Sequence, residues 1–403
     1  MPFSKDDILE VQPQLTLLSS LQRGGRAYAI IALTRSLTWV RGWLHYLFPT
    51  GNEPDISKSY KTRAHLPVKC VLPPYRSTYL LETMKSRLTI TSIFIPVTYS
   101  AKSSTENLPT LFTIHGGGFT VGNPDDDNKW NRMFADTHEV LVIALNYSKA
   151  PFYPFPTGIH DLEALIMAFL ADDSLPIDRS QCSIAGFSAG GNLALAVTQM
   201  KDVKTAFKQH GSTGFKAVIP LYPGLDRTVT RDYKATLRQY KAGLSPNRNS
   251  TTDSLHGSGK AFDWSYIPVG QDLRDPLVSP IYAPRETLPP HIFLIACELD
   301  LSSHDAWRMA CRLAGREEPS MDEKPGREEC GETGKLELLD EKFAWEALER
   351  GVRWLLVPDV VHGFDHLPPL LLGDETSVRD AEMKNIKVIE EVGHWLKTRV
   401  YVQ

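Results

Sequence analysis

A serine lies between glycines where an apolar run changes into a helical pattern. Ser188 belongs to residues 186–191, which follow the apolar run 182–185 and precede the helix-forming run 192–197. Glycines on both sides leave room for a strained turn that lifts a hydroxyl out of the end of a strand. The pattern predicts strand, turn and helix with Ser188 at the apex, and hence a serine hydrolase.

A serine hydroxyl is a weak nucleophile at neutral pH, so this chemistry needs further groups. A base must take the hydroxyl proton, an acid must orient the base, and hydrogen-bond donors must stabilise the oxyanion that forms. For a serine at such an apex, the expected chain order is serine, then acid, then histidine, each after a later strand. The partners are therefore expected C-terminal to Ser188.

The acid is expected directly after a buried strand. Asp300 follows the apolar run 291–297, and open α/β sheets place functional groups at the carboxyl ends of their strands. We therefore predict Asp300 as the orienting acid. Glu298 and Asp305 are the competing carboxylates, but Asp305 falls in the next helical pattern, where it is expected to cap the helix or face solvent.

The base is expected in the loop after the last apolar strand. His362 stands there, and the glycine that follows it lets the backbone turn. His304 and His366 are second choices because they are near the acid and base loops. The histidines without a matching partner are expected to be structural; they are His45, His160, His210, His256, His291 and His394.

Three consecutive glycines supply candidate oxyanion donors. They follow His115 at the end of the run 113–115. Without side chains, the backbone N–H groups of this loop can approach a substrate oxygen, and the N–H after the serine can complete the site. The predicted oxyanion residues are Gly116, Gly117, Gly118 and Ala189.

The elements that would position these groups alternate along the chain. Apolar runs rich in Val, Ile and Leu, separated by helical patterns, predict an α/β fold with a mostly parallel sheet covered by helices on both faces. The expected strands are 88–97, 110–115, 140–146, 181–185, 217–222, 291–297 and 354–358. The expected helices are 130–137, 158–170, 190–201, 303–313 and 379–399.

Three segments depart from this alternation. Residues 1–60 precede the first expected strand and are mainly helical in pattern, and residues 224–276 are a polar insertion between two strands. Residues 315–336 are charged and rich in turn formers, which predicts a surface loop. We therefore expect one catalytic domain over residues 61–403, preceded by an N-terminal helical segment.

The ordered motifs resemble the hormone-sensitive lipase branch of the α/β-hydrolases, which includes arylacetamide deacetylase and microbial carboxylesterases. The resemblance rests on residues 115–118, 146–156, 186–191 and 362–364. It implies Ser188 as nucleophile, Asp300 as orienting acid and His362 as general base. It also implies oxyanion donation from Gly117, Gly118 and Ala189 around a loop shaped by Gly116, and a cap built from residues 1–60 and 224–276.

The chain departs from that branch at two places. After the acid strand, residues 300–305 keep the aspartate but lack the usual D-P-L-x-D-E pattern. Asn146 and Lys149 replace the acid and the leucine of the usual D-Y-R-L-A-P stretch. These replacements bear on the shape of the pocket more than on the type of reaction.

Composition narrows the classes of partner and the compartment. The net charge is −4 without a long basic block, so nucleic acid is not expected as a partner. Five cysteines without C-x-x-C spacing and an acidic start without a signal pattern predict a cytoplasmic protein. Residues 27–48 approach the length of a membrane span, but Arg35 and Arg41 interrupt them. We expect an amphipathic helix over an apolar pocket, in preference to a membrane contact.

The leading hypothesis is hydrolysis of a carboxylic ester of a bulky small molecule through an acyl-enzyme, without metal or organic cofactor. The same site could instead cleave a lactone, a thioester or a carbon–carbon bond in the tailoring of a secondary metabolite. A third hypothesis, from a different class, is a non-catalytic ligand receptor, which the presence of His362 disfavours. The acyl and alcohol groups and the oligomeric state are left open.

Overall fold

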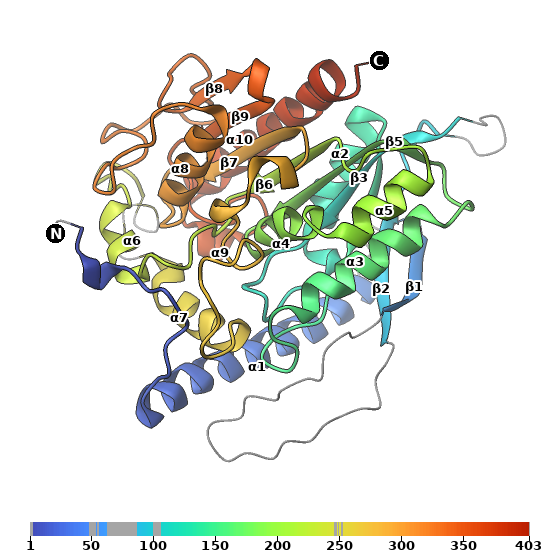
Figure 1. The fold of residues 1–403 in the computed structure, drawn as a ribbon. Helices are drawn as coiled ribbons and strands as arrows, with labels where there is room; N and C mark the ends of the chain where they lie inside the picture. Colours follow the sequence, from blue (N-terminus) through green and yellow to red (C-terminus); the bar gives the residue numbers. More distant parts are fainter. Residues whose placement is uncertain are drawn as a thin grey trace.

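The computed structural model describes residues 3–47, 54, 56–62, 87–99, 106–245, 248, 250 and 253–402. Cys70 and residue 48 of the apolar segment lie outside them, as do five residues of the insertion at 246, 247, 249, 251 and 252. The described strands form one nine-stranded sheet in the order β1-β2-β4-β3-β5-β6-β7-β9-β8 (Figure 1). The strands are β1 (Ile56–Thr62), β2 (Arg87–Phe94), β3 (Leu108–Ile114), β4 (Leu141–Leu145), β5 (Ile177–Phe187), β6 (Ala217–Leu221), β7 (His291–Cys297), β8 (Ala344–Ala347) and β9 (Val352–Val357).

The centre of the sheet is parallel and its edges are antiparallel. Strands β4, β3, β5, β6, β7 and β9 pair in parallel, whereas β1 pairs with β2, β2 with β4 and β8 with β9 in antiparallel fashion. The prediction of a mostly parallel sheet is confirmed. The expectation that residues 1–60 precede the first strand is wrong at their end, because β1 begins at Ile56.

Helices cover both faces of this sheet. The main helices are α1 (Leu17–Leu47), α2 (Asn128–His138), α3 (Thr157–Leu170), α4 (Ala189–Thr198), α5 (Lys201–Gln209), α6 (Arg231–Leu237), α7 (Ser254–Tyr266), α8 (Ser303–Ala314), α9 (Pro369–Leu372) and α10 (Glu375–Trp395). Short 3-10 turns lie at Lys5–Asp7, Pro124–Asp127, Pro280–Tyr282, Arg285–Thr287 and Leu348–Arg350, and a π-helical turn, Leu396–Val400, follows α10.

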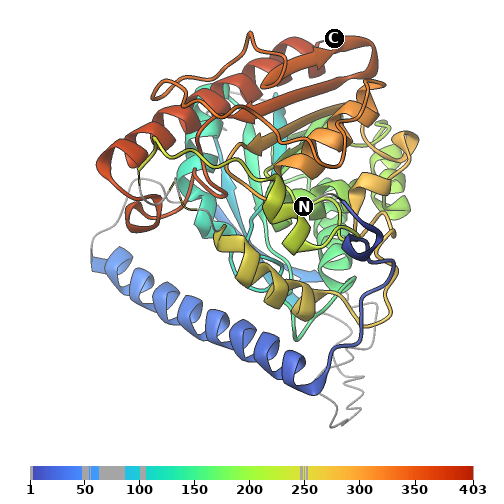
Figure 2. The same ribbon diagram turned by 90° about the vertical axis from the view of Figure 1, so that its left-hand side faces the viewer.

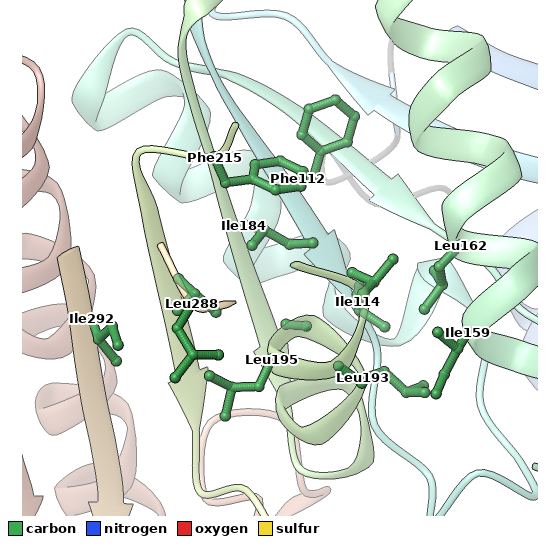
Figure 3. Packing of buried hydrophobic residues seen from close by; sticks show 14 of the residues in the cluster. Phe112, Ile114, Ile159, Leu162, Ile184, Leu193, Leu195, Phe215, Leu288 and Ile292 are labelled. Carbon is green, nitrogen blue, oxygen red and sulfur yellow. The ribbon is translucent and has the colours of Figure 1, made fainter. Parts of the chain in front are cut away.

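The core consists of two apolar layers, one on each face of the sheet. Phe112 and Ile114 of β3 point into the layer beneath α3, α4, α5 and α8, whereas Leu111 points into the layer beneath α2 and α10. This alternation follows from the period-two geometry of a strand. Figure 3 shows part of the first layer, where Ile184 of β5 lies near Phe112 and Leu193 of α4 lies near Ile159 of α3.

Helices α1 and α7 lie apart from the sheet, near the carboxyl ends of its central strands (Figures 1 and 2). Helix α1 runs alongside α7, with the indole N–H of Trp264 donating to Ser20 Oγ at 3.1 Å. A Cβ at Gly24 would lie 3.1 Å from the Trp264 ring, so the glycine permits this close approach. No helix among the described residues is both long and apolar enough to cross a membrane.

Residues 315–336 contain neither helix nor strand, but they are attached to the core. The backbone N–H groups of Arg327 and Gly331 donate to Glu298 Oε1 at 2.9 Å and to Asp359 Oδ2 at 2.6 Å. Both acceptors are buried carboxylates of the loops that follow β7 and β9. The segment therefore contacts the two loops that carry Asp300 and His362.

Candidate active site

Ser188 occupies the sharp turn between β5 and α4. Its φ of 55° and ψ of −114° lie outside the regions that a serine ordinarily adopts. The turn needs small neighbours, because a Cβ at Gly186 would lie 2.1 Å from the carbonyl oxygen of Gly190. At Gly190 a Cβ would lie 2.0 Å from the carbonyl oxygen of Ile114 in β3. These glycines allow the backbone to raise the Ser188 hydroxyl above the sheet.

The structure brings Ser188, His362 and Asp300 into one hydrogen-bonded chain. His362 Nε2 lies 2.7 Å from Ser188 Oγ, and His362 Nδ1 lies 2.7 Å from Asp300 Oδ2. Asp300 has no exposed surface, and its Oδ1 accepts from the Ser302 N–H at 2.9 Å. A buried carboxylate bonded to Nδ1 favours the tautomer in which Nε2 can take a proton from the serine.

The competing carboxylates have other partners. Glu298 Oε2 accepts from Lys241 at 2.7 Å, and Asp305 Oδ2 pairs with Lys234. Among the described residues, neither carboxylate forms a hydrogen bond with His362. Asp300 is therefore the acid that the fold places behind the imidazole.

The second-choice histidines also lie elsewhere in the hydrogen-bond network. His304 Nε2 lies 3.0 Å from the carbonyl oxygen of Ser320, and His366 Nδ1 lies 3.2 Å from Asp365 Oδ1. Loss of solvent around the ring lowers the pKa of His366, but the charge of Asp365, its hydrogen bond to the ring and the charges of Asp127 and Asp126 together raise it to about 9. His366 nevertheless lines the same cavity as Ser188.

The glycine loop after β3 lies directly beside the turn at Ser188. A Cβ at Gly116 would lie 3.1 Å from the Phe187 carbonyl oxygen and 3.3 Å from Ser188 Cβ. Gly117 and Gly118 adopt φ values of 102° and 58°, which favour glycine. Within the described part of the chain, no hydrogen bond engages the N–H groups of Gly117, Gly118 or Ala189. They are available to an oxyanion.

A polar cluster supports this loop from behind. The ring of His115 stacks on Tyr147 with 4.6 Å between centroids, and its Nε2 lies 3.3 Å from Asn146 Oδ1. Lys149 Nζ donates to the same oxygen at 2.8 Å. Burial, followed by the charge of Lys149, holds the pKa of His115 well below its usual value. His115 supports the loop through its contact with Asn146 and through Nδ1, which lies 2.8 Å from the Gly116 carbonyl oxygen.

A buried cation joins the acid loop to the base loop. Lys241 lies in the 224–276 insertion and is 1% exposed, and its Nζ lies 2.7 Å from both Glu298 Oε2 and Asp359 Oδ1. Glu298 also accepts from the Asp359 N–H at 2.8 Å. Because these carboxylates precede Asp300 by two residues and His362 by three, Lys241 ties together the loops that carry both.

The insertion reaches the acid loop a second time, through α7. Asp253 caps this helix by accepting from the Leu255 N–H at 2.7 Å, and its other oxygen accepts from the Leu301 N–H at 3.1 Å. Burial, followed by the charge of Asp300, raises the pKa of Asp253. The position of α7 is thus coupled to the loop that carries Asp300.

A cavity of about 180 Å³ opens at Ser188 and His362. Its other walls include Gly118, Phe262 of α7 and two arginines, Arg227 and Arg231. Both arginines lie in the polar insertion of residues 224–276, for which the sequence predicted no catalytic role. Their place in the wall depends on the fold, and their residue type was the one signal available.

A larger cavity of about 420 Å³ lies between α1 and the segment that follows the glycine loop. Ile31, Thr34 and Arg35 line it from α1, and Thr120 and Lys149 line it from the catalytic side. In the described residues no group of three or more His, Cys, Asp or Glu side chains is arranged to hold a metal ion.

Comparison with known proteins agrees with this architecture. Residues 111–326 match a family described as having the α/β-hydrolase fold. The chain is 24% identical to an arylesterase of Saccharolobus solfataricus over 220 residues, which are 54% of this chain and 66% of that protein. It is 33% identical to human arylacetamide deacetylase-like 2 over 153 residues, which are 37% of this chain and 36% of that protein. The matches thus span one third to two thirds of these relatives.

A solved structure shows the same fold. A hyperthermophilic esterase from the archaeon Pyrobaculum calidifontis superposes with a TM-score of 0.53 and 16% identity, covering 97% of this chain and 93% of the esterase. The family match includes the loop after β3, the Ser188 turn and the Asp300 loop. The chain belongs to the α/β-hydrolase fold family, with arylacetamide deacetylases and esterases among its relatives.

Proposed function

We propose that this protein hydrolyses a carboxylic ester through an acyl-enzyme formed at Ser188. The observation that carries the proposal is the pair of 2.7 Å hydrogen bonds that joins Ser188 to His362 and His362 to Asp300. The strained turn at Ser188 and the adjacent glycine loop support it, because a nucleophile and its oxyanion donors must face one reacting carbonyl.

The proposed reaction has two halves. Ser188 Oγ attacks the ester carbonyl carbon while His362 Nε2 takes its proton, and Asp300 stabilises the resulting imidazolium. The carbonyl oxygen becomes an oxyanion held by the N–H groups of Gly117, Gly118 and Ala189. The oxyanion collapses, the alcohol departs with the proton from His362, and a water molecule then repeats the sequence to release the acid and free Ser188.

The cap is part of the proposal. We assign residues 1–60 and 224–276 to a cap over the catalytic domain of residues 61–403, because α1 and α7 border the two cavities near Ser188. The cavity at Ser188 measures about 180 Å³ and the one bordered by α1 about 420 Å³. Their size favours a bulky small molecule as the natural substrate.

Steady-state hydrolysis of 4-nitrophenyl esters from acetate to octanoate tests the proposal. The wild-type protein is expected to turn over at least one of them, and Ser188→Ala and His362→Ala to lose this activity. His210→Ala is the matched control, since His210 is exposed and lies before the amino end of β6, whereas Ser188 follows the carboxyl end of the neighbouring parallel strand β5. Turnover of lactones or thioesters but of no acyclic ester would contradict the proposed substrate class. The assignment of Ser188 and His362 as the reacting groups would stand.

A further inference from the structure

The wall of the catalytic cavity contains two arginines that share one carboxylate. Arg227 follows β6, Arg231 begins α6, and Asp263 lies on α7. Arg231 donates to both oxygens of Asp263, with Nε 2.6 Å from Oδ2 and Nη2 3.0 Å from Oδ1. This two-point geometry is the strongest form of an arginine–carboxylate pair. Arg231 therefore makes the stronger contact with Asp263, and the two arginines carry one positive charge more than this carboxylate balances.

Arg227 is the surplus cation of this group. It reaches Asp263 through a single contact, from Nη1 to Oδ1 at 3.1 Å. Its Nε is buried and has no hydrogen-bond partner among the described residues. A guanidinium has five N–H donors, and one left without a partner away from water carries a free-energy cost. No other carboxylate in the described part of the chain forms an ion pair with Arg227.

The surplus charge lies close to the reacting groups. The guanidinium carbon of Arg227 is 5.5 Å from the ring centre of Phe119, the residue directly after Gly118. A Cβ at Gly224 would lie 3.2 Å from Arg227 Nη2, so this glycine leaves space beside the guanidinium. Arg227, Gly224 and Ser188 line the same cavity.

Among the described residues, no carboxylate lines the catalytic cavity to cancel this charge. Of the residues that line it, Arg227, Arg231 and His366 are basic, and His366 is paired with Asp365. The nearby pairs of Lys234 with Asp305 and of Arg308 with Asp226 have their own partners. A polar wall of this kind costs binding energy for an apolar substrate and favours an anionic one.

The fit of Arg231 against α7 shows that this wall is built around the arginines. A Cβ at Gly259 would lie 2.2 Å from Arg231 Nη1 and 2.3 Å from its Cζ. Only a residue without a side chain leaves room for the guanidinium at this position. Arg231 in turn pairs with Asp263, which does not line the cavity, whereas Arg227 does.

We propose that the substrate is an ester that carries a carboxylate, and that Arg227 binds this carboxylate in the catalytic cavity while Arg231 keeps Asp263 from neutralising it. The inference rests on the proposed ester hydrolysis at Ser188 and names the class of its substrate. The carboxylate can belong to the acyl part, as in a half-ester of a dicarboxylic acid, or to the alcohol part, as in an acylated hydroxy acid.

Paired substrates that differ in charge test the inference. On the acyl side, mono-4-nitrophenyl adipate is compared with 4-nitrophenyl hexanoate; on the alcohol side, 4-acetoxybenzoate is compared with 4-acetoxybenzamide. In at least one pair, wild-type kcat/KM is expected to favour the anion by roughly tenfold or more, the size of one hydrogen bond to a charged group. The pair that shows the preference identifies the side that carries the carboxylate.

Variants separate recognition from a structural role. Arg227→Gln is expected to lower kcat/KM for the anionic ester far more than for its neutral partner, so that the preference for the anion disappears. Arg227→Lys, which keeps the charge, should retain part of the preference. Lys260→Gln is the matched control, because it removes one positive charge from α7 beside Gly259 but outside the catalytic cavity. It should leave the preference unchanged.

The outcomes distinguish the two proposals. If the wild-type protein hydrolyses neutral esters as well as anionic ones in both pairs, the carboxylate inference is overturned and ester hydrolysis stands. If Arg227→Gln lowers kcat/KM for both members of a pair alike, the arginine is structural and the inference is likewise overturned. If no ester of either charge is hydrolysed and Ser188 does not react with an acylating probe, the proposed function itself fails. Should Arg227→Gln fold poorly, two measurements still test the carboxylate inference. They are the wild-type ratios of kcat/KM for the anionic over the neutral ester, and the same ratios in Arg227→Lys.

Discussion

The ammonium group of Lys241 lies 2.7 Å from Glu298 Oε2, and both side chains are shielded completely from solvent. The same ammonium group also lies 2.7 Å from Oδ1 of a second carboxylate, Asp359. The insertion thus contributes a buried cation to the two loops that carry Asp300 and His362. Removing this cation would leave two carboxylates buried without their partner.

Lys241→Met is therefore expected to lower both stability and activity. Breaking a buried ion pair from one side costs about 3–5 kcal/mol, and displacement of either loop would disturb the hydrogen bonds of His362. Urea unfolding and kcat on a 4-nitrophenyl ester measure the two effects. Adding Asp359→Asn to Lys241→Met should recover part of the stability, because Asp359 Oδ1 faces the lysine while it is Oδ2 that accepts a backbone N–H, from Gly331. Unchanged stability and kcat in the single variant would show that Lys241 positions neither loop.

The two carboxylates after β7 should respond differently to the loss of charge. Asp300→Asn is expected to lower kcat by about 10⁴-fold, because the amide no longer favours the productive tautomer of His362. Asp305→Asn is the matched control; it leaves Lys234 buried without its partner, so it should lower stability while kcat of the folded protein stays near wild type. Equal losses of kcat in both variants would contradict the assignment of Asp300.

The glycine loop offers a test of the oxyanion donors. Gly118→Ala would place a Cβ 2.3 Å from the Phe262 ring at a φ of 58°, so the loop must move. Because one oxyanion donor is worth about 10²–10³ in kcat, we expect a loss of this order with little change in KM. Gly25→Ala is the control, since a Cβ there meets nothing within 4 Å. Wild-type kcat for Gly118→Ala would exclude the loop from the oxyanion site.

Lys149 predicts a pH-dependent stability. Burial lowers its pKa from 10.5 to about 7, although the charges of Asp161 and Asp126 oppose this. Between these two values the unfolded chain binds a proton that the folded chain does not, so this lysine destabilises the fold increasingly as pH falls from 10.5 to 7. Below pH 7 the effect is constant, since both states are protonated.

Lys149→Met should remove this dependence. We expect the variant to gain a few degrees in Tm over the wild type at pH 6 to 7, and the gain to shrink steadily as pH rises toward 10.5. The comparison of the two proteins at each pH cancels the contributions of titrating groups that do not interact with Lys149; His115, Asp161 and Asp126 do interact with it. A Tm difference that does not vary with pH would show that Lys149 keeps an ordinary pKa.

The sequence predicted the central strands well, but it missed the edges of the sheet. Strands such as β4 (Leu141–Leu145) are buried on both faces and appear as continuous apolar runs. Strand β1 carries three polar residues and two lysines among seven positions, and β8 is only four residues long. An edge strand pairs on one side and needs no apolar run, so these two elements gave no comparable signal.

Local sequence marks the candidate nucleophile and its glycine loop because backbone geometry there demands particular residues. Ser188 and Gly118 adopt positive φ values where neighbouring backbone and side chains lie close. Few residue types fit such positions, so the local sequence there forms a recognisable motif. No local motif marks Lys241 or Arg227, because the partner of Lys241, Glu298, is 57 residues away in the chain and that of Arg227, Asp263, is 36 residues away. Charges joined over such distances become visible only when the fold places them together.

Covalent labelling of Ser188 tests the central claim most directly. The folded wild-type protein is treated with a fluorophosphonate, which phosphonylates an activated serine, and the modified residue is located by peptide mass spectrometry. We predict a single adduct on Ser188, with none in Ser188→Ala and much slower labelling in His362→Ala. A folded wild-type protein that remains unlabelled at Ser188, or that labels at the same rate without His362, would contradict the account.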